Sequence, residues 1–199
     1  MNNEVLKCIL ERRAIRKYKQ AQISEEELDT ILRAGIYAPS AGGRQGVFFL
    51  VSQNPVVNEK LGRINRNCFY ERKPDGRLPP GKIFISKDQP SIADDVTMLS
   101  AFYGAPTVIT LFGENPQYGV NDCSVAAENM MLAAHSLGIG SCLIGRAGET
   151  FASDYGKDLI REWQIDEIYK PVCHVILGYR NSELPVPRPR KENRIKRIY

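Results

Sequence analysis

Residues 122–145 read DCSVAAENMMLAAHSLGIGSCLIG, and this stretch decides the fold class. Its longer first part places apolar side chains at the spacing of one helical face, which predicts a helix that Asp122 caps and Gly138 ends. The short apolar run 139–144 follows at once and is typical of a buried strand. A helix that passes directly into a buried strand favours a domain in which helices cover a sheet.

The sequence on both sides continues this alternation. We expect a helix over 4–12 and a second one from Ser24, where Glu27 supplies the other half of a capping box and Ala38-Pro39 is the stop. The same patterns predict strands over 47–52, 107–112 and 172–177, and helices from Pro55 and over 151–163. The total is about four strands and five or six helices.

Residues 68–105 break this pattern with turns and charges. We expect an excursion or lid there, with a short strand at 83–85. Neither an internal repeat nor a linker interrupts the rest, so residues 1–199 are predicted to form a single domain. Residues 180–199 extend beyond the last strand as a tail.

Composition argues against several classes of protein. The five cysteines are widely spaced and never paired as C-x-x-C, and only His135 and His174 could supply imidazole ligands. We therefore expect reduced thiols and no metal site. No apolar run is long enough to span a bilayer, and the N-terminus carries no secretory signal pattern. The expectation is a cytoplasmic protein without a membrane partner.

The net charge of +4 is concentrated at the C-terminus. Residues 188–199 hold six Lys and Arg against one acidic residue, whereas the other 187 residues hold 21 basic and 22 acidic ones. A basic tail suits either a nucleic acid or the phosphate of a small cofactor. Because the body has no basic excess to extend a nucleic-acid footprint, we expect the phosphate and no nucleic acid.

Catalytic motifs built on side chains are missing. The sequence has no G-x-S-x-G elbow, no P-loop, no H-E-x-x-H motif and no G-x-G-x-x-G fingerprint after a strand. Hydride chemistry can be carried by a cofactor while the protein supplies binding and electrostatics. The shortage of acid–base residues therefore favours cofactor chemistry without a catalytic side chain.

Arginines stand where a phosphate could bind. Arg12, Arg13 and Arg16 follow the first helix, and Arg188 and Arg190 lie near the other end of the chain. In extended backbone, which the prolines at 187 and 189 favour, Arg188 and Arg190 point to the same side. A planar guanidinium binds phosphate through two parallel bonds, and a phosphate dianion favours more than one such group. The alternative is that these are solvated surface charges.

A second candidate is the loop 39–46, which reads PSAGGRQG. Its adjacent glycines let the backbone approach a flat ligand closely, and exposed amides can bond to the polar edge of a ring. The alternative is an ordinary flexible connection.

Four blocks resemble the nitroreductase family. RRAIRKY at 12–18 resembles the family's R-R-S-I-R-x-Y/F entry, and APSAGGRQ at 38–45 is similar to its A-P-S-x-x-N-x-Q loop. The central helix followed by GIGSCLIG at 138–145 is similar to its helix and G-I/L-G-S/T strand. LGY at 177–179, with PRPR at 187–190, resembles its terminal G-Y and basic-x-Arg pair. Each block is weak alone, but the four occur in family order and span nearly the whole chain.

The resemblance implies an α+β fold of three layers, in which helices flank a mixed, mainly antiparallel sheet. It implies a homodimer whose C-terminal tail is swapped onto the partner, with FMN at two sites in the interface. NAD(P)H and a small-molecule electron acceptor are the implied substrates. The residues that the resemblance assigns to the FMN site are Arg12, Arg13, Ala14, Arg16, Pro39, Ser40, Ala41, Gly43, Asn67, Leu143, Ile144, Gly145, Arg188 and Arg190.

The likeness also gives these residues roles. The arginines contact the phosphate and ribityl chain, and residues 39–41 come from the other subunit to flank the isoalloxazine ring. Ile144 and Gly145 lie near the reactive edge, where backbone amides can bond to N5. Asn65 or Asn67 supplies a ribityl contact.

The chain departs from the family pattern at four positions. Ala14 stands where Ser is usual, Gly43 where Asn is common, and Gly46 where Pro is common. Arg146 stands where a small or acidic residue is frequent. We expect FMN binding to survive these changes, while the acceptor is left open.

The implied reaction moves hydride from NAD(P)H to FMN and then to an acceptor such as a nitroaromatic, a quinone or a flavin. One site serves both substrates in turn, which gives ping-pong kinetics. The same scaffold also supports flavin fragmentation, reductive dehalogenation and azoline oxidation. A non-catalytic FMN carrier or sensor and a nucleic-acid-binding module are alternatives from other classes.

Overall fold

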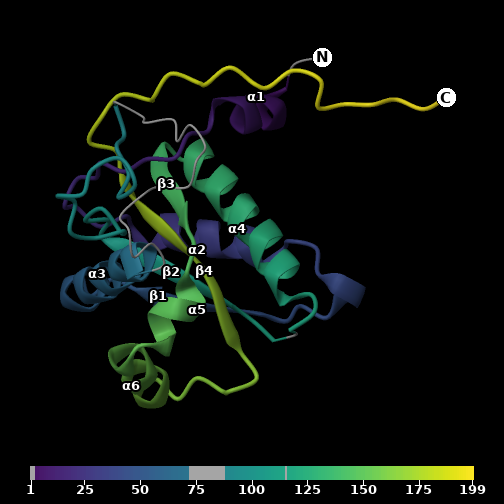
Figure 1. Ribbon diagram of the computed structural model, residues 1–199. Helices are drawn as coiled ribbons and strands as arrows, with labels where there is room; N and C mark the ends of the chain where they lie inside the picture. The colour runs from purple at the N-terminus through teal and green to yellow at the C-terminus, as the bar shows by residue number, and fades with distance from the viewer. Residues whose placement is uncertain (1–2, 72–87, 115) are drawn as a thin grey trace.

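The computed structural model describes residues 3–71, 88–114 and 116–199. Its centre is a sheet of four strands in the order β1-β2-β4-β3, with every neighbouring pair antiparallel (Figure 1). The strands are β1 (Val47–Ser52), β2 (Thr107–Gly113), β3 (Ile139–Ile144) and β4 (Lys170–Tyr179). A parallel bridge between Ala14 and Ser141 brings the segment after the first helix alongside β3.

Helices cover both faces of this sheet. α2 (Glu25–Ile36) and α4 (Gly119–Ser136) pack on one face. α3 (Pro55–Glu71), α5 (Ala147–Ala152) and α6 (Asp154–Glu162) pack on the other. α1 (Glu4–Glu11) lies against the C-terminal half of α4, and a 3-10 turn, η1 (Ala41–Gly43), follows α2. This is the three-layer α+β architecture that the family resemblance implies.

Each face of the sheet has its own core because side chains alternate along a strand. On β4, Cys173, Val175 and Leu177 face α2 and α4, whereas Ile176 belongs to the opposite core. β2 is buried along its whole length and is apolar except at Thr107, Thr110 and Gly113, although its neighbours are antiparallel. Each large apolar side chain fully buried there contributes roughly 1.5–3 kcal/mol.

Two predicted helix boundaries were wrong. α4 begins at Gly119, before the predicted cap, and Asp122 instead accepts a hydrogen bond from the Ala41 N–H (3.0 Å). The predicted helix over 151–163 is divided into α5 and α6 at Ser153. The Ser153 hydroxyl accepts from the Gly156 N–H (3.1 Å), which starts a new helix.

The predicted excursion at 68–105 overlaps the end of α3. α3 continues to residue 71 and so includes 68–71, and the strand predicted at 83–85 lies outside the described residues. The described part, 88–105, contains no helix or strand, yet Ile92 and Phe102 are buried in the core on the α3 side. This part of the segment is therefore packed into the domain.

Two apolar surfaces are exposed in the single chain. α1 has no buried residue, and its Val5 and Leu10 are 67% and 68% exposed. The tail runs extended past α1 and away from the body (Figure 1), with Ile195 and Ile198 84% and 85% exposed. Adjacent apolar side chains left in water indicate surfaces that another chain could cover.

Candidate functional site

Five arginines from the two ends of the chain line one cavity of about 470 Å³. They are Arg12, Arg13, Arg16, Arg188 and Arg190, and the lining is completed by Ala14, Ser91, Asp94, Pro185 and Val186. Asp94 is the sole acidic residue among the described lining, so the cavity is strongly positive. Planar cations gathered in this way suit a phosphate dianion.

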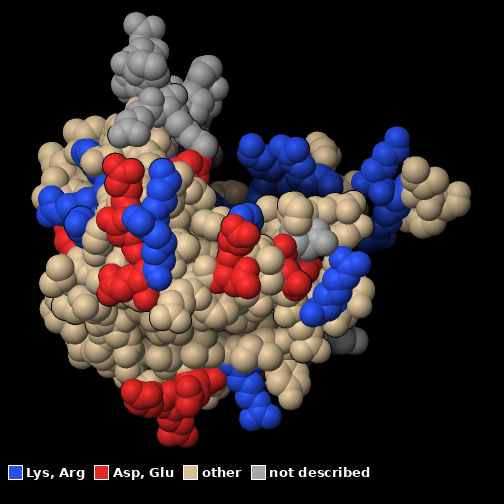
Figure 2. Space-filling model, turned by 90° about the horizontal axis from the view of Figure 1, so that it is seen from below, with Lys and Arg blue, Asp and Glu red and all other residues tan. Residues whose placement is uncertain are grey.

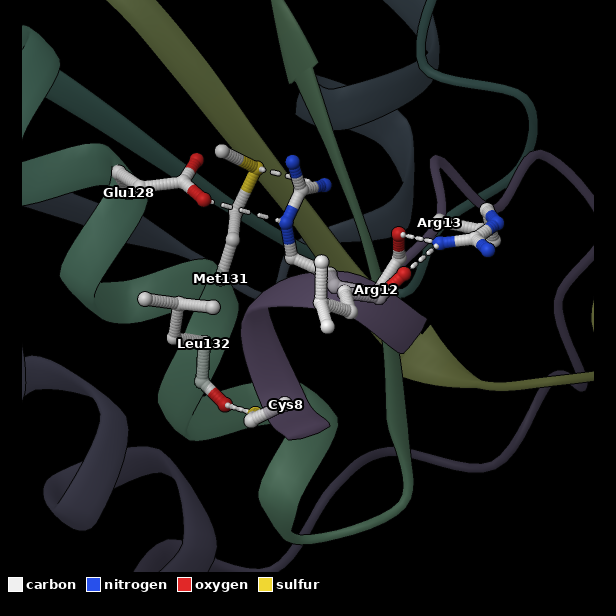
Figure 3. Close-up of polar contacts among 7 residues, drawn as sticks. Cys8, Arg12, Arg13, Glu128, Met131 and Leu132 are labelled. Atoms are coloured by element: carbon white, nitrogen blue, oxygen red, sulfur yellow. Dashed lines mark hydrogen bonds and ion pairs between the residues drawn. The ribbon is translucent and has the colours of Figure 1, made fainter. Parts of the chain in front are cut away.

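The segment after α1 is held against β3 and α4. The Ile15 N–H donates to Ser141 O (2.9 Å), and the buried Ile15 side chain anchors the segment in the core. Arg12 reaches over α4 (Figure 3), where its Nε lies 3.3 Å from Glu128 Oε1 and its Nη1 lies 4.0 Å from the Met131 sulfur. These contacts fix the direction in which the segment leaves the helix.

Arg13 points away from Arg12 and folds back onto the end of α1 (Figure 3). Its Nη1 donates to Leu10 O and to Arg12 O, both at 2.7 Å. A guanidinium in this position satisfies carbonyls that the helix end leaves without partners. Arg13 therefore stabilises α1 as well as lining the cavity.

Gln89 connects the arginine segment to the start of the tail. Its side chain is buried, with Oε1 accepting from the Arg16 N–H and Nε2 donating to Ser182 Oγ (2.6 Å). Arg16 Nη1 donates to Gln89 O (3.1 Å), and its guanidinium lies 5.8 Å from the centre of the Tyr103 ring. The two ends of the chain are thus joined beside the cavity.

Gln89, Ser91 and Asp94 are site residues that sequence reasoning missed. Asp94 Oδ2 accepts from both the N–H and the hydroxyl of Ser91 (2.8 and 2.9 Å), which closes a short turn at the cavity wall. All three residues follow the undescribed part of the chain and lie in a stretch without periodicity. No local pattern in the sequence marks them.

The predicted residues 143–145 form an accessible edge at the end of β3. Leu143 is exposed, Ile144 is buried, and a Cβ added at Gly145 would meet open space. Asn65 of α3 is fully buried and donates to Gly145 O (2.8 Å). Asn67 is exposed on α3 and is absent from the described lining of the arginine cavity.

The loop predicted at 39–46 lies near the opposite end of α4. Ser40 Oγ accepts from the Gln45 N–H (2.8 Å), and Gly42 and Gly43 have φ values of +62° and +66°, which glycine adopts without strain. Ala41 is bonded to Asp122 near the beginning of α4, whereas Arg12 contacts Glu128 and Met131, about two turns further along that helix. One chain therefore does not bring Pro39, Ser40, Ala41 or Gly43 to the arginine cavity.

The thiols and imidazoles offer little chemistry. The five cysteines lie in the described part of the chain and are not joined in disulfides, and burial raises the pKa of Cys123 and of Cys173 to about 12. Burial also lowers the pKa of His174 to about 3, so that this imidazole is neutral. The described residues hold no group of three His, Cys or acidic side chains that could bind a metal. Of the helices described, none is both long and apolar enough to cross a membrane.

The charges also bear on nucleic-acid binding. Seen from below, the body carries acidic and basic side chains close together, and basic residues gather on the tail at the right (Figure 2). A nucleic-acid footprint needs basic contacts spread along a surface. Five of the arginines line a single small cavity.

The fold and the cavity define an α+β protein in which the two ends of the chain meet at a cavity lined by five arginines. The sequence profile of the Nitroreductase family matches residues 9–179. The chain belongs to the nitroreductase family.

Similar proteins have been described. A protein of Methanothermobacter thermautotrophicus is 31% identical over 88% of this chain and 77% of its own length. A Bacillus subtilis protein named as an FMN reductase using NAD(P)H is 25% identical over 97% of this chain and 70% of its own length. The crystal structure of a nitroreductase with bound FMN from Bacteroides fragilis is 29% identical, covers 100% of both chains and has a TM-score of 0.80.

Proposed function

We propose that this chain is an FMN-dependent oxidoreductase that passes hydride from NAD(P)H to a small acceptor such as a nitroaromatic, a quinone or a flavin. The observation that carries the proposal is the cavity in which Arg12, Arg13, Arg16, Arg188 and Arg190 meet. FMN ends in a phosphate, and a family member 29% identical to this chain was crystallised with FMN. The relative from Bacillus subtilis is named for NAD(P)H and FMN.

The residues of the chain fit FMN by their donor chemistry. The arginine forks would hold the phosphate, and the hydroxyl of Ser91 and the carboxylate of Asp94 offer partners for ribityl hydroxyls at the same wall. The exposed backbone at Gly145, with open space where a side chain would project, admits a flat ring. Bound FMN supplies the hydride chemistry, and both substrates use one site in turn, which gives ping-pong kinetics.

We also propose that the active form is a homodimer. A second copy would supply the residues 39–43 that one chain holds far from its own arginine cavity, and its tail would be swapped across the interface. The exposed apolar residues of α1 and of the tail support this arrangement, because their burial is favourable. The homodimer also accounts for a site whose predicted parts contact different turns of α4, Ala41 at Asp122 and Arg12 at Glu128 and Met131.

Spectroscopy and mass spectrometry of the purified protein test the proposed function. We expect a yellow protein that releases FMN, not FAD, on denaturation. NAD(P)H should bleach the flavin absorbance without oxygen, and an added quinone or nitroaromatic should restore it. Protein that cannot take up FMN would overturn the proposal. Bound FMN that NAD(P)H never bleaches would indicate a carrier or sensor instead.

A further inference from the structure

The turn that follows β3 has an unusual backbone. Arg146 adopts φ 64° and ψ 26°, the left-handed conformation that is unfavourable for a residue with a Cβ. Glycine would adopt it without strain, yet the chain has arginine there. A strained residue of this kind persists when its surroundings hold it in place, and the contacts of Arg146 identify what holds it.

Asn65 is the centre of those contacts. From α3, its Nδ2 donates to Gly145 O (2.8 Å) and to Thr150 Oγ1 (2.9 Å). Its Oδ1 accepts from Arg146 Nη2 (3.1 Å), and its main-chain oxygen lies 3.4 Å from Arg146 Nε. The side chain is fully buried. The Asn65 amide therefore bonds to two consecutive residues of the turn, to Gly145 through its nitrogen and to Arg146 through its oxygen.

Thr150 completes the arrangement from α5. Its hydroxyl donates to Arg146 O (2.7 Å) and its N–H donates to the same oxygen (2.9 Å). Thr150 is also fully buried. Asn65, Thr150 and the turn thus form one closed hydrogen-bond network, in which the position of the Gly145 peptide depends on Asn65.

We propose that Asn65 is a positioning residue that sets how the turn 144–146 meets the flavin. This inference rests on the proposed function and on the family resemblance, which implies that Ile144 and Gly145 lie near the reactive edge of FMN. An amide N–H can donate to the bare N5 nitrogen of oxidised flavin, but reduction puts a hydrogen on N5 and removes that acceptor. Displacing the turn therefore weakens binding of oxidised FMN more than binding of reduced FMN, and the midpoint potential rises.

The test compares Asn65→Leu with a matched control, Asn58→Leu. Asn58 is also a buried asparagine on α3, and it donates to the main-chain oxygens of Ser52 and Pro106 (both 3.2 Å), away from the turn. Both variants lose buried hydrogen bonds, so both should lose stability. Only Asn65→Leu should change the balance between the two redox states of bound FMN.

The measurement is the midpoint potential of bound FMN, obtained by equilibration with a reference dye, together with FMN affinity from fluorescence quenching. A tenfold greater loss of affinity for oxidised than for reduced FMN raises the potential of this two-electron couple by about 30 mV. We expect a rise of at least that size in Asn65→Leu and none in Asn58→Leu. Thr150→Val, which removes one hydroxyl of the network, should raise it by a smaller amount.

The outcomes separate this inference from the proposed function. If wild-type protein binds no FMN, the proposed function fails. If wild-type protein binds FMN but Asn65→Leu leaves the potential unchanged, Asn65 has only a structural role and the inference is wrong. If Asn65→Leu does not fold, Thr150→Val decides: an unchanged potential there overturns the inference, and a raised one supports it.

Discussion

Arg12 belongs both to the packing of α1 on α4 and to the arginine cavity. Its Nε lies beside Glu128, and its side chain is about a quarter exposed. The contacts of the fold already hold the Arg12 guanidinium in place. Arg12 therefore loses little side-chain conformational entropy when a ligand binds. Arg188 and Arg190 differ, because both are exposed on the extended tail while lining the same cavity.

Replacement of single arginines should separate specific phosphate contacts from general charge. Arg12→Ala, Arg188→Ala and Arg190→Ala should each weaken FMN binding about ten- to a hundred-fold, since a charge-assisted hydrogen bond contributes roughly 1.5–3 kcal/mol. Lysine at 188 or 190 should restore only part of the affinity, because an ammonium lacks the bidentate fork. Titration of FMN into apo-protein, followed by fluorescence quenching, measures all variants on one scale.

The tail supplies internal controls for this experiment. Arg194, Lys196 and Arg197 are exposed and lie outside the described lining of the cavity. Changing each of them to Ala should alter the binding free energy by less than about 1 kcal/mol, as for other exposed charges. Equal losses at cavity and control positions would mean that the tail acts through its total charge, and the phosphate assignment would be wrong.

At the scale of elements, the sequence predicted best where local signals agree. Ser24 and Glu27 form the predicted capping box, and β1 and β3 have the predicted bounds. The failures have a common cause, namely contacts between distant segments. Asp122 looks like a cap but binds the loop at Ala41, and Asn65 faces inward because of where α3 packs. Neither fact can be read from residues that are neighbours in sequence.

β4, one of the two inner strands of the sheet, carries a buried histidine that makes stability depend on pH. His174 is fully buried, its Nδ1 lies 2.8 Å from Thr110 Oγ1, and burial lowers its pKa to about 3. In the unfolded chain the pKa returns to about 6.5, so below that pH the unfolded state binds the extra proton. Stability is therefore full above about pH 6.5 and is lost as pH falls towards 3, by roughly 1.4 kcal/mol per unit.

Urea unfolding at about pH 7 and about pH 5 should reveal this loss. We expect wild-type protein to lose roughly 2 kcal/mol between the two conditions, and His174→Leu to lose much less. His135 is the matched control, since it is only partly buried and its pKa is lowered less, mainly by burial. His135→Asn should keep most of the pH dependence. A wild-type and a His174→Leu protein with parallel pH profiles would contradict the assignment.

At the scale of the whole molecule, the exposed surfaces and the divided site lead to the same arrangement. The body forms two cores around one sheet, yet α1 and the tail expose apolar side chains. The loop at 39–46 is fixed to the far end of α4 from the arginine cavity. A swapped homodimer would cover the exposed apolar side chains of α1 and the tail, and it would bring the loop at 39–46 of one chain to the arginine cavity of the other. Loss of assembly should therefore be accompanied by loss of flavin binding.

Two truncations test this dependence. Stopping the chain after Ser182 keeps the bond from Asn181 N–H to Lys17 O (3.0 Å) and the contact of Gln89 with Ser182, but removes the rest of the tail. We expect monomer or aggregate without flavin.

Stopping after Arg190 keeps both tail arginines and removes the exposed Ile195 and Ile198, so assembly should weaken and FMN affinity should fall although every cavity arginine is present. Light scattering and flavin absorbance measure the two effects. If the chain ending at Arg190 is a stable dimer with full FMN affinity, residues 191–199 are a solvated extension and the swap does not involve them. If the chain ending at Ser182 is also dimeric and yellow, the tail has no part in the site.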